Sequence, residues 1–197
     1  MFRHSIGLAA VVAVVVSACG SQPPASPNIS AASARASSAA TASPVPSVQP
    51  LSGDAALEDL LPDEIAGQPL SKTSLTGPDF VSSGTAATFE LGEFAAALNA
   101  RSKEVSIAYA YETSQVFVWV FAFRAGGVAQ ETLVNELEVA VGGSGTVWEN
   151  LTVGGKSVLH PTDPARAPLY VYPTGDTIFL VRTAEPSVAD EVFAKLP

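Results

Sequence analysis

The chain has 197 residues, of which 10 are Lys or Arg and 19 are Asp or Glu, so its formal net charge is -9 at pH 7. The basic residues are scattered, and the sequence therefore lacks the basic face with which nucleic-acid-binding proteins neutralise phosphates. Cys19 is the one cysteine, which excludes a disulfide framework and metal sites built from several thiolates.

The first twenty residues have the charge and hydropathy pattern of a signal peptide. Arg3 and His4 form a short basic start, and residues 6–16 form an unbroken run of apolar or small side chains. This run is shorter than the ~20 residues that a helix needs to cross a bilayer. The motif Val16-Ser17-Ala18-Cys19-Gly20 then places an aliphatic residue and two small residues before the cysteine.

This motif resembles the lipobox of bacterial lipoprotein signal peptides. The resemblance covers residues 1–20, and it implies that residues 1–18 are removed and that Cys19 becomes the lipidated first residue. Lipoproteins of this kind carry a diacylglyceryl thioether on the cysteine and often an N-acyl chain, which together give stable anchoring. We therefore expect a protein anchored by lipid on the extracytoplasmic face of the cell membrane. An uncleaved anchor and a simple secretory signal are the alternatives.

Residues 19–53 are expected to form a disordered tether behind the lipidated cysteine. They are rich in Ser, Ala and Pro, and Arg35 is their one charged residue. Such a segment cannot bury enough apolar surface to offset its loss of chain entropy on folding. Flexible-chain scaling gives the tether an end-to-end distance of roughly 30 Å, which would hold the following domain away from the lipid headgroups.

The remaining residues, 54–197, are expected to form one globular domain. Asp54 is placed to cap the first helix, and Gly154-Gly155 is placed to form a two-residue hairpin turn. Hydrophobic periodicity predicts helices at 55–61, 85–100 and 128–141 and a last helix that begins at Pro186. It predicts a strand, turn and strand over 65–75, and further strands at 105–111, 115–124, 148–153, 156–160, 169–172 and 177–182.

These elements predict an α+β fold, with a single, largely antiparallel sheet of about eight strands and helices on one face. Residues 109–115 align with residues 170–176, and each stretch has two tyrosines before a turn, an apolar strand and an amphipathic helix. We therefore expect two related units, each made of two hairpins and a helix, with the helix at 85–100 inserted in the first.

The strand at 115–124 is the most informative segment of the predicted domain, because it is apolar on both faces. One interpretation is a central strand whose two faces are both covered by the core. The other is an aromatic face that binds an apolar small molecule or a partner protein. The side chains of that candidate binding face are Phe117, Trp119, Phe121 and Phe123.

His160 and Asp163 are the remaining candidates for chemistry, since His160 is the one histidine after residue 18. A metal site needs three or four ligands, and the neighbouring sequence supplies little besides Asp163, so we expect no metal and no cofactor. We expect a binding or scaffolding module for a protein partner or a small apolar ligand, and not an enzyme. The alternatives are an envelope hydrolase centred on His160 and Asp163 and an accessory subunit of a membrane complex.

Overall fold

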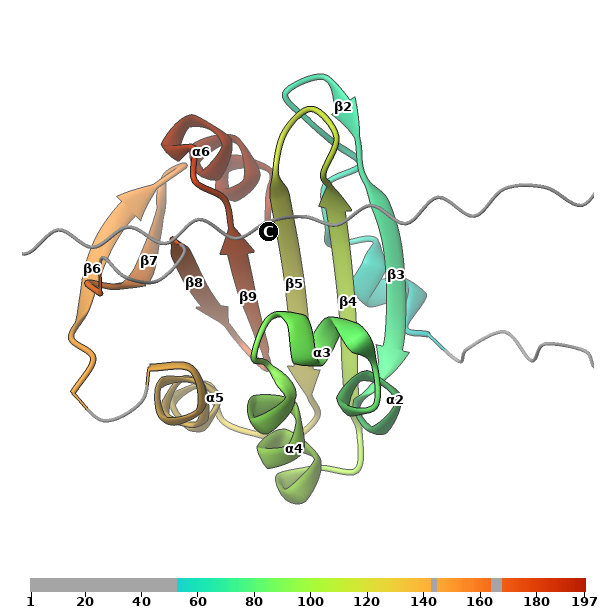
Figure 1. Ribbon diagram of the computed structural model, residues 1–197. Helices are drawn as coiled ribbons and strands as arrows, with labels where there is room; N and C mark the ends of the chain where they lie inside the picture. The colour runs from blue at the N-terminus through green and yellow to red at the C-terminus, as the bar shows by residue number, and fades with distance from the viewer. Residues whose placement is uncertain (1–52, 143–144, 164–167) are drawn as a thin grey trace, which may run out of the picture. The chain divides into compact units, whose positions relative to one another are not determined.

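The computed structural model describes residues 53–142, 145–163 and 168–197 (Figure 1). The expectations for the signal peptide, for Cys19 and, apart from Gly53, for the tether lie outside the described residues. The described part carries its own hydrophobic core, because all residues of its two core clusters lie between Leu57 and Leu196. Within these described ranges, no helix is long and apolar enough to cross a membrane.

An antiparallel sheet of seven strands forms the centre of the domain, which confirms the expected α+β fold with a single large sheet (Figure 1). Its strands stand in the order β3-β4-β5-β9-β8-β7-β6, and β1 and β2 form a small separate sheet. The strands are β1 Glu64–Ile65, β2 Gln68–Pro69, β3 Ser71–Thr76, β4 Val105–Glu112, β5 Val118–Ala125, β6 Trp148–Val153, β7 Lys156–Pro161, β8 Leu169–Thr174 and β9 Thr177–Arg182.

Two hairpins of this sheet follow from their turn residues. Gly154 and Gly155 connect β6 to β7 with φ angles of 54° and 79°, in the left-handed region that glycine adopts without strain. Gly175 has a φ angle of 59° in the turn between β8 and β9. Both turns lie where the sequence predicts them, and the paired strands on either side of each turn are therefore also confirmed.

Both faces of the two central strands are apolar. On one face Phe121 of β5 lies opposite Leu180 of β9, and on the other face Val120 lies opposite Val181. All four side chains are buried, the first pair in one core cluster and the second pair in the other. Because the hydrophobic effect favours removing both faces from water, each face needs a layer of its own.

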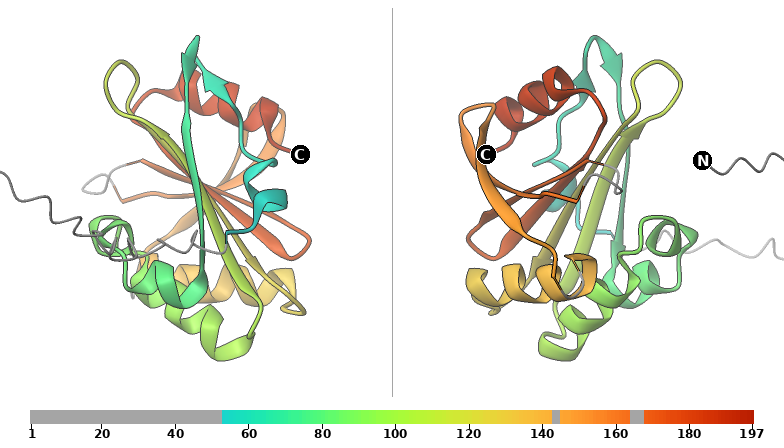
Figure 2. Two further views of the ribbon diagram at one scale, coloured as in Figure 1. Left: turned by 90° about the vertical axis from the view of Figure 1, so that its right-hand side faces the viewer. Right: turned by 60° about the vertical axis from the view of Figure 1, so that its left-hand side comes forward.

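Helices cover both faces of the sheet, which corrects the expectation of helices on one face (Figure 2). The face of Phe121 packs against α2 to α5, and the face of Val120 packs against α1 and α6. We call the first of these the aromatic face. The helices are α1 Ala55–Glu58, α2 Gly77–Val81, α3 Gly84–Thr88, α4 Gly92–Arg101, α5 Gln130–Leu137 and α6 Pro186–Lys195, and a π-helical turn, Glu138–Gly142, extends α5.

The expected helix over 85–100 is two helices, α3 and α4. The break lies at Glu90, whose φ angle of 57° no α-helix can accommodate. The first helix begins as expected, because the Asp54 carboxylate accepts a hydrogen bond from the Leu57 amide. Asp54 also forms an ion pair of 3.1 Å with Arg124 of β5, which ties the start of the domain to the centre of the sheet.

The expected repeat is correct for three strands of each unit, but not for the helices, nor for the first hairpin, because β1 and β2 form a separate sheet and β6 has no counterpart in the large one. The order β3-β4-β5 is mirrored by β7-β8-β9 about the antiparallel β5 and β9 pair. A two-fold axis between antiparallel neighbours is perpendicular to the sheet, so equivalent helices would lie on one face. Instead α5 lies on the aromatic face and α6 lies on the opposite face. Tyr109 likewise lies on the aromatic face and Tyr170 on the opposite face. The two units therefore do not superpose with their helices.

Candidate functional site

The structure divides the predicted aromatic binding face into a buried half and an accessible half. Phe121 and Phe123 are fully buried. Phe123 packs against Phe80 of α2 and Phe94 of α4, with ring centroids 5.4 and 5.0 Å apart. These two side chains therefore belong to the core, which corrects the expectation that all four aromatic residues could line one binding face.

Phe117 and Trp119 form the accessible half. Trp119 is partly buried, and Phe117, which lies just before β5, keeps 59% of its surface exposed. Together they line a pocket of about 400 Å³ on the aromatic face, within the range of small-molecule sites in proteins. The surface of this pocket is almost wholly apolar, and the residues that line it are Thr88, Phe89, Thr113, Phe117, Trp119, Pro168, Arg182, Thr183 and Ala184.

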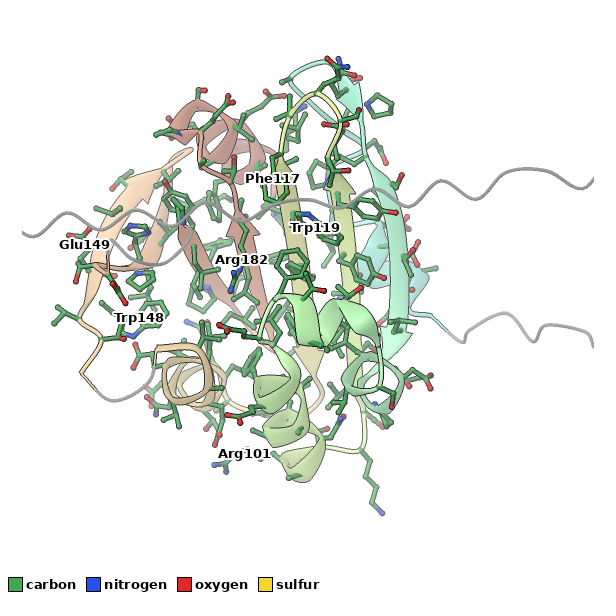
Figure 3. The ribbon with its side chains drawn as sticks, viewed as in Figure 1. Arg101, Phe117, Trp119, Trp148, Glu149 and Arg182 are labelled. Atoms are coloured by element: carbon green, nitrogen blue, oxygen red, sulfur yellow. The ribbon has the colours of Figure 1, made fainter. Side chains whose placement is uncertain are left out.

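Two of the lining residues, Trp119 and Arg182, belong to a row of side chains at one level of the sheet. In register across four strands, Tyr111 of β4 lies opposite Trp119, Trp119 lies opposite Arg182 of β9, and Arg182 lies opposite Leu169 of β8. The rings of Tyr111 and Trp119 stack at 4.5 Å with an angle of 11° between their planes. This stacking restricts the orientation of the Trp119 indole. In Figure 3 Phe117, Trp119 and Arg182 lie together beside the upper part of β5 and β9.

Phe89 forms the wall of the pocket that belongs to the helical layer. The centroid of its ring lies 4.5 Å from the centroid of the Trp119 ring. The chain reverses just after Phe89, where the amides of Glu90 and Leu91 donate to the carbonyl oxygens of Ala87 and Ala86. This is the hydrogen-bond pattern of a Schellman motif, which ends α3 and needs the left-handed conformation of Glu90. The end of α3 therefore sets the position of Phe89 above the sheet.

Glu112 organises the connection from β4 to β5, which carries Phe117 into the pocket. Its carboxylate accepts hydrogen bonds from the amides of Ser114, Gln115 and Val116 at 2.6, 3.0 and 2.5 Å, and from the hydroxyl of Ser114 at 2.5 Å. The Ser114 hydroxyl, followed by the Val116 amide, lowers the pKa of the Glu112 carboxyl to about 2. The Glu112 carboxylate thus holds the backbone of residues 114–116, which leads to Phe117.

The Glu112→Gln substitution is expected to loosen this connection. The pKa of Glu112 falls from 4.5 to about 2 on folding, so its contribution is complete above about pH 4.5 and is lost as the pH falls toward 2. At neutral pH we therefore expect several-fold faster hydrogen exchange at the Val116 amide in Glu112→Gln than in the unsubstituted chain. Glu149→Gln, at an exposed position on β6, is the matched control. Equal exchange at Val116 in both variants would contradict this role of Glu112.

His160, from the second group of candidates, lies against the carbonyl oxygen of Leu169 and the ring of Tyr170. The ring Nδ1 of His160 lies 2.8 Å from the carbonyl oxygen of Leu169, and because a carbonyl oxygen can only accept, Nδ1 carries the proton. The imidazole also stacks on the ring of Tyr170, with centroids 5.0 Å apart. Among the residues that the structure describes, no group of three or more His, Cys, Asp or Glu is placed to hold a metal ion.

A second hollow, of about 500 Å³, lies on the helical layer, but its walls differ from those of the first. It is lined by small or aliphatic side chains of α2, α3 and the π-helical turn, by Gly92, and by Glu90 and Glu93. It contains no aromatic ring among its lining residues. Aromatic rings supply much of the contact area in apolar binding sites, so we take the pocket of Phe117 and Trp119 as the candidate site.

No protein family, no curated protein and no solved structure matches this chain in comparisons of its sequence and fold. The residues of the pocket therefore carry the functional argument by themselves. Sequence reasoning identified Phe117 and Trp119 but missed Phe89 and Arg182. One sequence signal was available for Arg182. It lies two residues after Leu180 and four after Ile178 in β9, on the same buried face of the strand. An arginine in phase with two buried residues is unusual for a strand.

Proposed function

We propose that this protein is an extracytoplasmic lipoprotein, anchored to the cell membrane through Cys19, whose domain binds a small, largely apolar molecule. The observation that carries the binding proposal is the apolar pocket of about 400 Å³ at the accessible end of the aromatic strand. The lipobox resemblance at Val16-Ser17-Ala18-Cys19-Gly20 supports the location. We propose no catalytic residue, metal or cofactor for this function, and no nucleic-acid partner.

The shape of the site favours a small molecule over a protein partner. A partner protein would need a broad apolar surface, and stable interfaces bury about 800 Å² on each side. Here the exposed aromatic surface is concentrated at Phe117, and the neighbouring Trp119 is recessed between Tyr111 and Phe89. A recessed ring beside an exposed ring suits a ligand that enters the pocket and covers Phe117 from outside.

Binding of the uncharged fluorescent probe N-phenyl-1-naphthylamine tests this proposal. The chain from residue 19 onward, with Cys19→Ala, is suitable because its core lies within the described part. We expect one probe to bind per chain, and we expect Phe117→Ala to weaken binding by about tenfold, since covering this ring removes apolar surface worth about 1.4 kcal/mol. Fluorescence titration at constant protein concentration measures both quantities.

The matched control is Val147→Ala, which removes an exposed apolar side chain outside the pocket. Val147 is 65% exposed, close to the exposure of Phe117. Its removal is expected to leave the dissociation constant unchanged. An unsubstituted chain that binds no probe, or equal losses in Phe117→Ala and Val147→Ala, would contradict the proposed binding function.

The anchoring part of the proposal predicts the outcome of metabolic labelling with a clickable fatty acid. The unsubstituted precursor is expected to incorporate label and to fractionate with membranes, because acyl chains on Cys19 would hold it there. Cys19→Ala is expected to lose the label and to leave the membrane fraction or to remain as an unprocessed precursor. Equal labelling of both chains would overturn lipidation at Cys19, without bearing on the pocket.

A further inference from the structure

Among the described residues that line the candidate pocket, Arg182 is the one with a charged side chain. It ends β9 on the aromatic face, in phase with Ile178 and Leu180, which are fully buried. Its position in the register is between Trp119 and Leu169. A guanidinium in such apolar surroundings loses part of its hydration, which is unfavourable for folding unless the group is well held or has a function.

The guanidinium of Arg182 is held by Phe89. Its Nη2 donates a hydrogen bond of 3.0 Å to the carbonyl oxygen of Phe89, and its central carbon lies 5.5 Å from the centroid of the Phe89 ring. These contacts orient the planar group at the edge of the pocket, and arginine remains protonated in such a site. The pocket therefore combines aromatic surface from Trp119 and Phe117 with the oriented positive charge of Arg182.

We infer that the ligand of this pocket is an amphipathic anion, with a compact apolar body that covers Trp119 and Phe117 and one carboxylate, sulfonate or phosphate group that binds Arg182. This inference rests on the proposed binding function and specifies the class of ligand. A planar guanidinium suits such groups because its N–H donors match the spacing of two oxygens. The charge of the whole chain, -9, disfavours anions in general, so a preference for an anionic ligand must come from the pocket itself.

Two matched probes test the inference. N-phenyl-1-naphthylamine and 8-anilinonaphthalene-1-sulfonate share the same ring system and differ by the sulfonate. We expect the chain from residue 19 with Cys19→Ala to bind the sulfonate at least about tenfold more tightly than the neutral probe, as for a charge-assisted hydrogen bond in a partly dehydrated site. Arg182→Gln is expected to abolish this preference, so that any neutral-probe binding it retains is no weaker than its binding of the sulfonate. Arg182→Lys, which keeps the charge, is expected to retain part of the preference.

The outcomes separate this inference from the proposed function. If the unsubstituted chain binds neither probe, the proposed function fails and the inference fails with it. If it binds both probes equally, or the neutral probe more tightly, the pocket binds apolar ligands and only the inference is overturned. A preference for the sulfonate that persists in Arg182→Gln also overturns it. If Arg182→Gln binds neither probe, the pocket needs Arg182 for its shape. The comparison of the unsubstituted chain with Arg182→Lys then tests the inference: a sulfonate preference that Arg182→Lys retains in part supports it, and the absence of a preference in both overturns it.

Discussion

Replacing Phe121 by alanine is expected to lower the free energy of unfolding by about 3–5 kcal/mol, a large part of the stability of a domain of this size. Phe121 is fully buried on the aromatic face and lies within ring-contact distance of Phe80, Phe89 and Trp119. Removal of the ring leaves a cavity between the sheet and the helices, and neither layer can move far enough to fill it. Chemical denaturation of the chain from residue 19, followed by circular dichroism, measures the loss.

Phe117→Ala is the matched control for Phe121→Ala, because it makes the same substitution four residues earlier on the same side of the strand. Phe117 is 59% exposed, so its removal is expected to change the free energy of unfolding by about 0.5 kcal/mol or less. Equal losses in the two variants would contradict the division of the aromatic strand into a buried half and an accessible half.

Gly154→Ala is expected to lower the free energy of unfolding by about 2–5 kcal/mol, because the turn between β6 and β7 touches α6 there. A Cβ atom on Gly154 would lie 2.4 Å from the carbonyl oxygen of Asp190 and 2.6 Å from the amide nitrogen of Ala194. Both are backbone atoms that cannot rotate away, so the helix must shift, which costs about 1–3 kcal/mol. The positive φ angle of Gly154 adds about 1–2 kcal/mol for any residue with a side chain.

Gly155→Ala isolates the conformational part of this effect. Gly155 also has a positive φ angle, of 79°, but nothing lies within 4 Å of a Cβ atom placed on it. Its substitution is therefore expected to cost about 1–2 kcal/mol. Thermal or chemical unfolding of the two variants measures the difference, and a Gly154→Ala chain as stable as Gly155→Ala would show that α6 does not pack closely on this turn.

The parts of the fold that sequence reasoning predicted correctly are those with local causes. The turn at Gly154-Gly155 needs residues that tolerate positive φ angles, and the cap at Asp54 needs a side chain that accepts from an amide. The alternation of β5 is local too, and it correctly separated the Phe121 face from the Val120 face. Such patterns report the conformation of one segment and not the neighbours that the segment acquires.

The features that could not be predicted depend on contacts between distant segments. The break at Glu90 places a residue other than glycine in the left-handed region, and no local sequence rule indicates it. Whether helices lie on one face or on both depends on where α1 and α6 dock, which periodicity does not show. The same limit applies to the repeat, whose two tyrosine pairs share a sequence pattern but lie on opposite faces.

The candidate site shows the same division. Phe117 and Trp119 were predicted from their spacing, whereas the burial of Phe121 and Phe123 depends on α2 and α4, which cover that part of the strand. Arg182 joins the pocket because β9 pairs with β5, a pairing between segments about 60 residues apart in the chain that no local pattern reveals. The positive charge of the pocket therefore depends on the topology of the sheet, and its aromatic rings come from β5, from the residue before it and from Phe89 at the end of α3.

We propose that the accessible end of the aromatic strand is a ligand-binding pocket. A crystal structure of the chain from residue 19, with Cys19→Ala and in complex with N-phenyl-1-naphthylamine, would show where the probe binds. We expect the naphthyl group to lie between Phe89, Phe117 and Trp119, on the aromatic face of the sheet. A probe bound elsewhere on the domain, with this pocket filled by its own side chains, would contradict the claim.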